Sequence, residues 1–83
     1  MVYEIEYKAS VAKDLARLDR AGARRIVAKL ERELGAGART GMPLQGEFHG
    51  LWRIRVGDYR VIYVRTERGF LVLHVSHRRE AYR

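Results

Sequence analysis

Arginines recur at alternate positions in the second half of the chain. Arg53 and Arg55 precede the dipeptide Gly57-Asp58, and Arg60 follows it. A two-residue hairpin turn that begins with glycine would place Arg55 directly opposite Arg60 on the neighbouring strand. Like charges that face each other destabilise a sheet unless an anion bridges them. The spacing therefore predicts that these guanidinium groups bind phosphate.

The segment around these arginines alternates between apolar and polar side chains. Period-two patterns run over residues 51–56, 59–65 and 70–76, and they predict a three-stranded antiparallel meander. The hairpin register pairs Val56 with Tyr59. One face of the first two strands should then face the core, and the arginines should lie on the other. The residues expected on the core face are Trp52, Ile54, Val56, Tyr59, Val61 and Tyr63.

The register of the last strand decides which of its side chains join the arginines. We expect residues 67–69 to form a three-residue loop with Gly69 in the left-handed conformation. The opposite register would bury His74 and Ser76, so the register that buries apolar residues is preferred. In this preferred register Leu71, Leu73 and Val75 point into the core, and Val72, His74, Ser76 and Arg78 join the arginine face.

One strand and two helices are expected before the meander. Residues 2–7 alternate and predict a short strand. Ser10 is a natural N-cap, and apolar residues at helical spacing indicate a first helix that runs to about Asp19. A fuller apolar stripe over residues 23–34 indicates a second helix, which Gly35 would end as a C-cap. The side chains expected on one side of the first strand are Tyr3, Ile5 and Tyr7.

The order of these elements predicts the fold class. Residues 35–41 hold three glycines and no periodicity, which indicates a loop that ends near Pro43. A strand, a helical hairpin and a three-stranded antiparallel meander predict an α+β fold with the helices packed on one face of the sheet. With 83 residues, we expect residues 1–83 to form a single domain.

The composition indicates a basic protein of a reducing compartment. Lysine and arginine number 17 against 10 acidic residues, which gives a net charge of +7, and 14 of the 17 cations are arginine. Guanidinium groups bind phosphate through paired hydrogen bonds, so the bias favours a nucleic acid partner. Cysteine is absent, and neither a signal peptide nor a membrane span is evident. We therefore expect a cytoplasmic protein with no membrane partner.

The meander and the C-terminal residues resemble the RelE group of the RelE/ParE toxin superfamily. The resemblance rests on G-x-Y-R-x-x-Y over residues 57–63, on H-R-x-x-x-Y-R over residues 77–83, and on the order of the elements. It covers nearly the whole chain. It implies the toxin of a type II toxin–antitoxin system, a ribosome-dependent endoribonuclease that cleaves messenger RNA through the RNA's own 2′-hydroxyl. Its partners would be a cognate antitoxin, mRNA and the ribosome, and it would need neither a metal nor another cofactor.

The resemblance also implies which residues form the catalytic site. By position they are Arg53, Arg55, Arg60, Arg78 and Tyr82. The first two positions are often lysine in relatives, so arginine keeps the charge but changes the hydrogen-bond geometry. Fixed cations would stabilise the negative charge that develops around phosphorus. Cations near Tyr82 would favour its phenolate, which could then accept the 2′ proton.

Several residues keep two interpretations. His74 either acts as an acid or base at the site or is a structural histidine of the sheet. His74 and His77 should face opposite sides of the strand, so they make a poor pair of metal ligands. Arg79 and Arg83 are possible accessory residues beside the tyrosine. Trp52 is expected in the core rather than stacked on a base. The cations of the second helix either contact ribosomal RNA or face water, and they are Arg24, Arg25, Lys29 and Arg32.

Two other functions fit the same pattern. A ParE-like inhibitor of DNA gyrase would share the scaffold without a nuclease site. A non-catalytic RNA-binding module would use the basic face for binding alone. The paired arginines and the C-terminal tyrosine favour the nuclease over the gyrase inhibitor.

Overall fold

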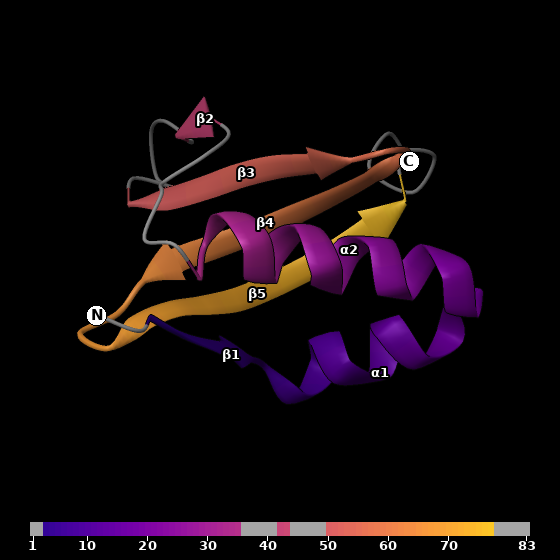
Figure 1. The fold of residues 1–83 in the computed structure, drawn as a ribbon, viewed down its shortest axis with the longest axis horizontal. Coiled ribbons are helices and arrows are strands. Elements are labelled where there is room, and N and C mark those ends of the chain that lie inside the picture. The colour runs from indigo at the N-terminus through magenta and orange to yellow at the C-terminus, as the bar shows by residue number, and fades with distance from the viewer. Residues whose placement is uncertain (1–2, 36–41, 44–49, 78–83) are drawn as a thin grey trace.

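A mixed sheet with two helices on one of its faces forms the protein, as the computed structural model shows (Figure 1). The structure describes residues 3–35, 42–43 and 50–77. No helix in this part of the chain is long and apolar enough to cross a membrane. The elements are β1 (Glu4–Tyr7), α1 (Ala9–Arg17), α2 (Arg20–Glu33), β2 (Met42–Pro43), β3 (Leu51–Val56), β4 (Tyr59–Arg65) and β5 (Gly69–His77).

The strands lie in the order β1-β5-β4-β3-β2. β1 runs parallel to β5, and the other neighbouring strands are antiparallel. The predicted strand, helical hairpin and three-stranded meander are therefore confirmed, as is the packing of both helices on one side (Figure 1). Residues 42–43, expected at the end of a loop, form a two-residue edge strand that pairs with Trp52 and Arg53.

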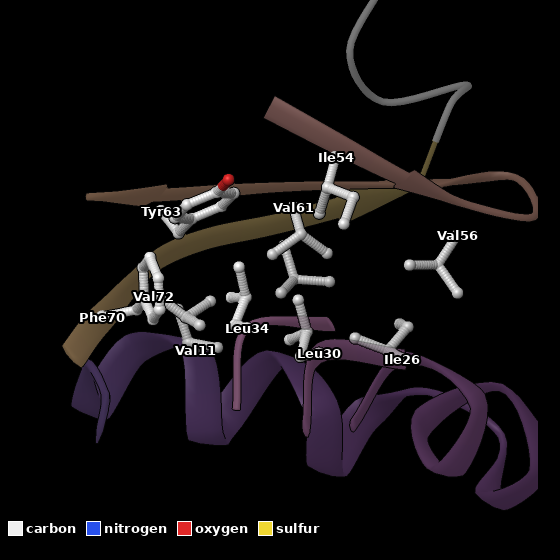
Figure 2. Close-up of a cluster of buried hydrophobic side chains, with 11 residues drawn as sticks. Val11, Ile26, Leu30, Leu34, Ile54, Val56, Val61, Tyr63, Phe70 and Val72 are labelled. Carbon is white, nitrogen blue, oxygen red and sulfur yellow. The ribbon is translucent and has the colours of Figure 1, made fainter. Parts of the chain in front are cut away.

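A layer of apolar side chains fills the space between the helices and the sheet (Figure 2). Val11 of α1 and Ile26 and Leu30 of α2 contribute from the helical side. Predicted core residues of β3 and β4 are buried as expected, while Trp52 and Tyr59 pack against the margin of the cluster. The buried residues of the sheet are Ile54, Val56, Val61, Tyr63, Phe70, Val72 and Val75.

The helix boundaries differ from those predicted. The N-cap of α1 is Lys8 rather than Ser10, because the Lys8 N–H still donates to the Val72 carbonyl of β5 at 3.1 Å, and the chain turns into the helix directly from there. Asp19 does not end α1 but caps α2, where its Oδ2 accepts from the Gly22 N–H at 3.1 Å. A short polar residue before a helical run was the available signal for this cap.

The C-terminal end of α2 also differs. Its C-cap residue is Leu34 in the right-handed helical conformation, not Gly35. Gly35 lacks a positive φ, and its N–H donates to the Glu31 carbonyl at 3.1 Å. Helical hydrogen bonding therefore continues through the glycine, so the left-handed cap that glycine favours is not used here.

The hairpin between β3 and β4 has the predicted register. Val56 pairs with Tyr59, and Arg55 pairs with Arg60. Gly57 has a φ of 59°, whereas φ is not positive at Asp58. This combination is the one that a type II′ turn requires, and it explains why glycine stands first in the turn.

A β-bulge in β5 overturns half of the prediction for the last strand. Ile62 pairs with His74, but Tyr63 pairs with Val72, so Leu73 is the extra residue. The alternation of side chains therefore reverses once within β5. Val75 enters the core and His74 and Ser76 join the arginine side, as predicted, because they lie beyond the bulge. Val72 is buried instead of Leu71 and Leu73, which are only partly buried, because these residues lie before or at the bulge.

The loop before β5 was also predicted wrongly. Gly69 is not left-handed, and the turn is held by the Thr66 N–H to the Gly69 carbonyl at 2.8 Å and by the Gly69 N–H to Thr66 Oγ1 at 3.0 Å. Glycine is needed for a different reason. A Cβ at this position would lie 2.6 Å from the backbone nitrogen of Glu4, so glycine lets β1 approach β5.

Candidate anion-binding face

The helices leave one side of the sheet uncovered, and the strand register assigns the residues on it. We call the part of this side formed by β3, β4 and β5 the open face. It comprises three rows of side chains that lie side by side across the three strands. The row farthest from the β3–β4 hairpin turn is apolar, and the row nearest that turn contains two arginines. The rows are Leu51, Val64 and Leu71, then Arg53, Ile62 and His74, and then Arg55, Arg60 and Ser76.

The row at the hairpin end concentrates the positive charge. Arg55 lies directly opposite Arg60, and Arg53 lies two residues from Arg55 on the same strand face. The Arg55 side chain is exposed, and those of Arg53 and Arg60 are half-buried. Within the described part of the chain, no carboxylate forms a salt bridge with Arg53 or Arg55. Their guanidinium groups are therefore available to an external anion.

Among the described strand residues, the carboxylates on this side of the sheet lie away from the arginines. Glu4 and Glu6 of β1 alternate with the core-facing Tyr3, Ile5 and Tyr7, and they are exposed at the β1 edge beside β5. β4 and β5 separate that edge from β3. The open side is thus acidic at the β1 edge and basic at the β3 end.

A lysine from the helical layer fixes the edge of the arginine-bearing strand. Lys29 of α2 donates from Nζ to the backbone carbonyl of Arg55 at 2.9 Å. β2 pairs with β3 only at Trp52 and Arg53, so this carbonyl lies beyond the end of β2. The sequence alone allows Lys29 either to contact RNA or to face water. A contact between residues 26 positions apart has no local signal in the sequence.

The apolar row was not predicted either. Leu51 and Val64 are partly buried although they face away from the core, and the bulge brings Leu71 beside Val64. An uninterrupted alternation would have turned Leu71 inward. The open face therefore combines an apolar strip with a basic strip, which suits a ligand that has both apolar and anionic groups.

The two described histidines of β5 point to opposite sides of the sheet, as expected. His74 is exposed on the open face. His77 pairs with Tyr59 on the core side, and their rings meet edge to face with centroids 5.2 Å apart. The described residues contain no cluster of histidine and carboxylate groups able to hold a metal ion.

Another arginine of the meander has a structural role. The Arg65 guanidinium lies over the rings of Tyr3 and Phe70, with its carbon 4.9 and 5.2 Å from their centroids. These contacts tie the end of β4 to the start of the chain. Arg65 therefore does not add to the charge that the open face presents.

The structure brings together three of the predicted site residues, Arg53, Arg55 and Arg60, with His74 on the neighbouring strand. The other predicted residues lie outside the described residues, and they are Arg78, Arg79, Tyr82 and Arg83.

Comparisons with known proteins agree with this architecture. Residues 5–82 match the family model described as the ParE toxin of the type II toxin–antitoxin system parDE. The toxin–antitoxin complex RelBE2 of Mycobacterium tuberculosis contains a chain that is 26% identical, with a TM-score of 0.78 over 94% of this chain and 100% of that one. No curated protein sequence matches the chain.

A second solved structure shows the same fold. It is the RelB–RelE antitoxin–toxin complex of Methanococcus jannaschii, with 20% identity and a TM-score of 0.68 over 93% of this chain and 94% of that one. The family match spans nearly the whole sequence, as the resemblance over residues 57–63 and 77–83 implied. The chain therefore belongs to the RelE/ParE superfamily of toxins from type II toxin–antitoxin systems.

Proposed function

We propose that this toxin is a ribosome-dependent endoribonuclease whose arginine-bearing open face holds the scissile phosphate of messenger RNA. The observation that carries the proposal is the direct pairing of Arg55 with Arg60, with Arg53 beside them. Two guanidinium groups at directly opposite positions of a sheet give one phosphate two cationic hydrogen-bond donors at once.

The chemistry needs little beyond positioning and charge. The 2′-oxygen attacks phosphorus, the bond from phosphorus to the 5′-oxygen breaks, and the products are a 2′,3′-cyclic phosphate and a 5′-hydroxyl. Negative charge builds on the phosphoryl oxygens as five-coordinate phosphorus forms. Guanidinium groups held in place by a sheet stabilise this charge without having to reorganise. Arg53, Arg55 and Arg60 have this role in the proposal.

Two proton transfers accompany the attack. In the proposal Tyr82 accepts the 2′ proton as a phenolate that Arg78 and neighbouring cations stabilise, and Arg53 or Arg78 assists the leaving 5′-oxygen. His74 lies on the row next to the Arg55–Arg60 pair and places an imidazole beside the proposed phosphate site. Arg79 and Arg83 are accessory cations in this scheme.

The same open face suggests how the toxin is held inactive. Its apolar row and its basic rows match an antitoxin segment that carries apolar and acidic side chains. The solved relatives are toxin–antitoxin complexes, which supports a cognate antitoxin as the partner. Such a segment would occupy the arginines and exclude RNA.

A ParE-like gyrase inhibitor is the second candidate, because the matching family model bears the ParE description. In that case the open face would contact a protein and cleave nothing. A non-catalytic RNA-binding module is the third candidate. The opposed arginines and the candidate base Tyr82 favour the nuclease over the gyrase inhibitor, and a cleavage assay separates the nuclease from the binding module.

Two assays separate these functions. After brief induction in cells, primer extension on translated messages should reveal cuts within codons, and Arg60→Ala should abolish them. The control Arg17→Ala removes one exposed charge from α1 and should leave them unchanged. Growth arrest without cuts, together with loss of supercoiling by purified gyrase, would identify the ParE-like activity instead.

A further inference from the structure

A pocket lies on the core side of the sheet, opposite the open face, at the tip of the β3–β4 hairpin. Its volume is about 260 Å³, and it opens between the start of α2 and the hairpin turn. We call it the tip pocket. Its lining includes Asp19, Gly22, Arg25, Asp58, Tyr59 and His77.

Two rings and a glycine shape the tip pocket. Tyr59 and His77 meet edge to face at an interplanar angle of 86°. Gly22 is buried, and a Cβ there would lie 3.5 Å from Tyr59 Oη and 2.7 Å from Asp19 Oδ1. A larger residue would therefore intrude between α2 and the tyrosine. Glycine keeps this side of the hollow open.

Charged groups surround the rings. Asp19, Arg25 and Asp58 line the hollow, and all three residues are exposed. Flat aromatic groups bordered by hydrogen-bond donors and acceptors are the surroundings in which proteins hold unstacked nucleobases. A volume below the ~300–1,000 Å³ of pockets for drug-sized ligands suits one ring system.

The tip pocket and the paired arginines occupy the same end of the sheet on opposite sides. Tyr59 immediately precedes Arg60, and His77 immediately follows Ser76, so each pocket ring neighbours a residue of the basic row. The Gly57-Asp58 turn is the edge around which a strand could pass from one side to the other. An RNA whose phosphate lies on the arginines therefore has a flanking nucleotide within reach of the pocket.

We propose that the tip pocket binds one nucleobase of the RNA that crosses the open face, and that it favours bases with an exocyclic amino group over uracil. The preference follows from Asp19 and Asp58, whose carboxylates accept hydrogen bonds from amino groups. The inference rests on the proposed function, because it takes RNA as the ligand. A side chain of the antitoxin is the competing occupant.

Binding is tested with short 2′-O-methyl RNA, which cannot be cleaved. Backbone and ring NMR signals of the whole chain are followed during titration with an oligonucleotide and with versions that carry an abasic site at each position in turn. The signals of Gly22, Tyr59 and His77 should shift, and removal of one particular base should cancel that shift and weaken binding about 5- to 150-fold.

The alternative outcomes are distinct. Shifts confined to Arg53, Arg55 and Arg60, the same for every abasic version, would overturn the pocket and leave RNA binding by the open face intact. Absence of any shift at saturating RNA would overturn the pocket, whereas the ribosome-dependent function is decided separately by the cleavage assay. If the NMR signals of the pocket residues shift only when the antitoxin is added, the pocket holds a side chain of the antitoxin rather than a nucleobase.

Base preference gives an independent measurement. Asp58→Asn keeps a residue suited to the turn but removes the charge, and Glu67→Gln makes the same change in the other hairpin loop. On ribosomes programmed with messages that differ in one base, Asp58→Asn should reduce the preference for amino-bearing bases over uracil while cleavage continues. Glu67→Gln should keep the wild-type preference. An unchanged preference in Asp58→Asn would contradict the role of the carboxylate.

Discussion

Replacing Arg55 by threonine should make the folded protein more stable while abolishing RNA cleavage. Arg55 faces Arg60 across β3 and β4, and its side chain is exposed. Threonine fits a strand well and removes the repulsion between the two guanidinium groups. The hydrogen bond from Lys29 goes to the Arg55 backbone carbonyl, so the substitution leaves it in place.

The size of the effect follows from the register. Directly opposed charges on neighbouring strands change stability by about 0.2–1 kcal/mol. Unfolding entropy of about 2.1 cal/mol/K per residue gives about 0.17 kcal/mol/K for a chain of 83 residues. The midpoint of thermal unfolding should therefore rise by about 1–6 °C. The gain should shrink in 1 M salt, where the screening length falls to about 3 Å.

Arg53→Thr is the matched control. It makes the same substitution on the same face of the same strand, but Arg53 lies opposite Ile62 rather than an arginine. Arg53 is half-buried beside β2 whereas Arg55 is exposed, so the gain from threonine differs between the two sites. The part of the excess stability of Arg55→Thr that disappears in 1 M salt therefore measures the repulsion. Calorimetry at low and high salt gives that difference, and inorganic phosphate should raise the midpoint of the wild type more than that of Arg55→Thr. An Arg55→Thr variant no more stable than Arg53→Thr at low salt would refute the reasoning.

Three further predictions concern the scaffold. Burial raises the pKa of Tyr7 above its ordinary value near 10, and its buried hydroxyl has no hydrogen-bond partner among the described residues. Above about pH 10 the stability of the wild type should therefore fall more steeply than that of Tyr7→Phe, and parallel losses in alkaline urea titrations would contradict this. Lys29→Met should cost about 0.5–1.5 kcal/mol in urea unfolding through the lost hydrogen bond to Arg55, whereas Arg32→Met should cost little, and equal costs would argue against the bond. Gly69→Ala should lower stability by about 1–3 kcal/mol because its Cβ would press on the β1 backbone, and an unchanged urea midpoint would exclude that close contact.

Local patterns in the sequence predicted the elements that place the arginines. The Gly57-Asp58 dipeptide set the hairpin register, and with it the pairing of Arg55 with Arg60. Alternation over β3 and β4 then separated core residues from site residues. These predictions succeeded because each depends on neighbours a few positions apart.

Features that depend on contacts between distant segments were missed. The bulge at Leu73 adds one residue to β5 opposite β4, and nothing in an alternating pattern marks it. Gly69 has a role only because β1 returns to pair beside it. The contact from Lys29 to Arg55 likewise needs α2 to lie near the edge of the sheet.

Single-turnover cleavage of ribosome-bound message tests the role of the arginines most directly. Wild-type toxin and Arg60→Ala are compared on the same stalled complex, with the charge control Arg17→Ala. If the guanidinium stabilises the charge that develops on the phosphate, Arg60→Ala should cleave about 10²- to 10³-fold more slowly while Arg17→Ala keeps the wild-type rate. A folded Arg60→Ala protein that cleaves at the wild-type rate would contradict the account.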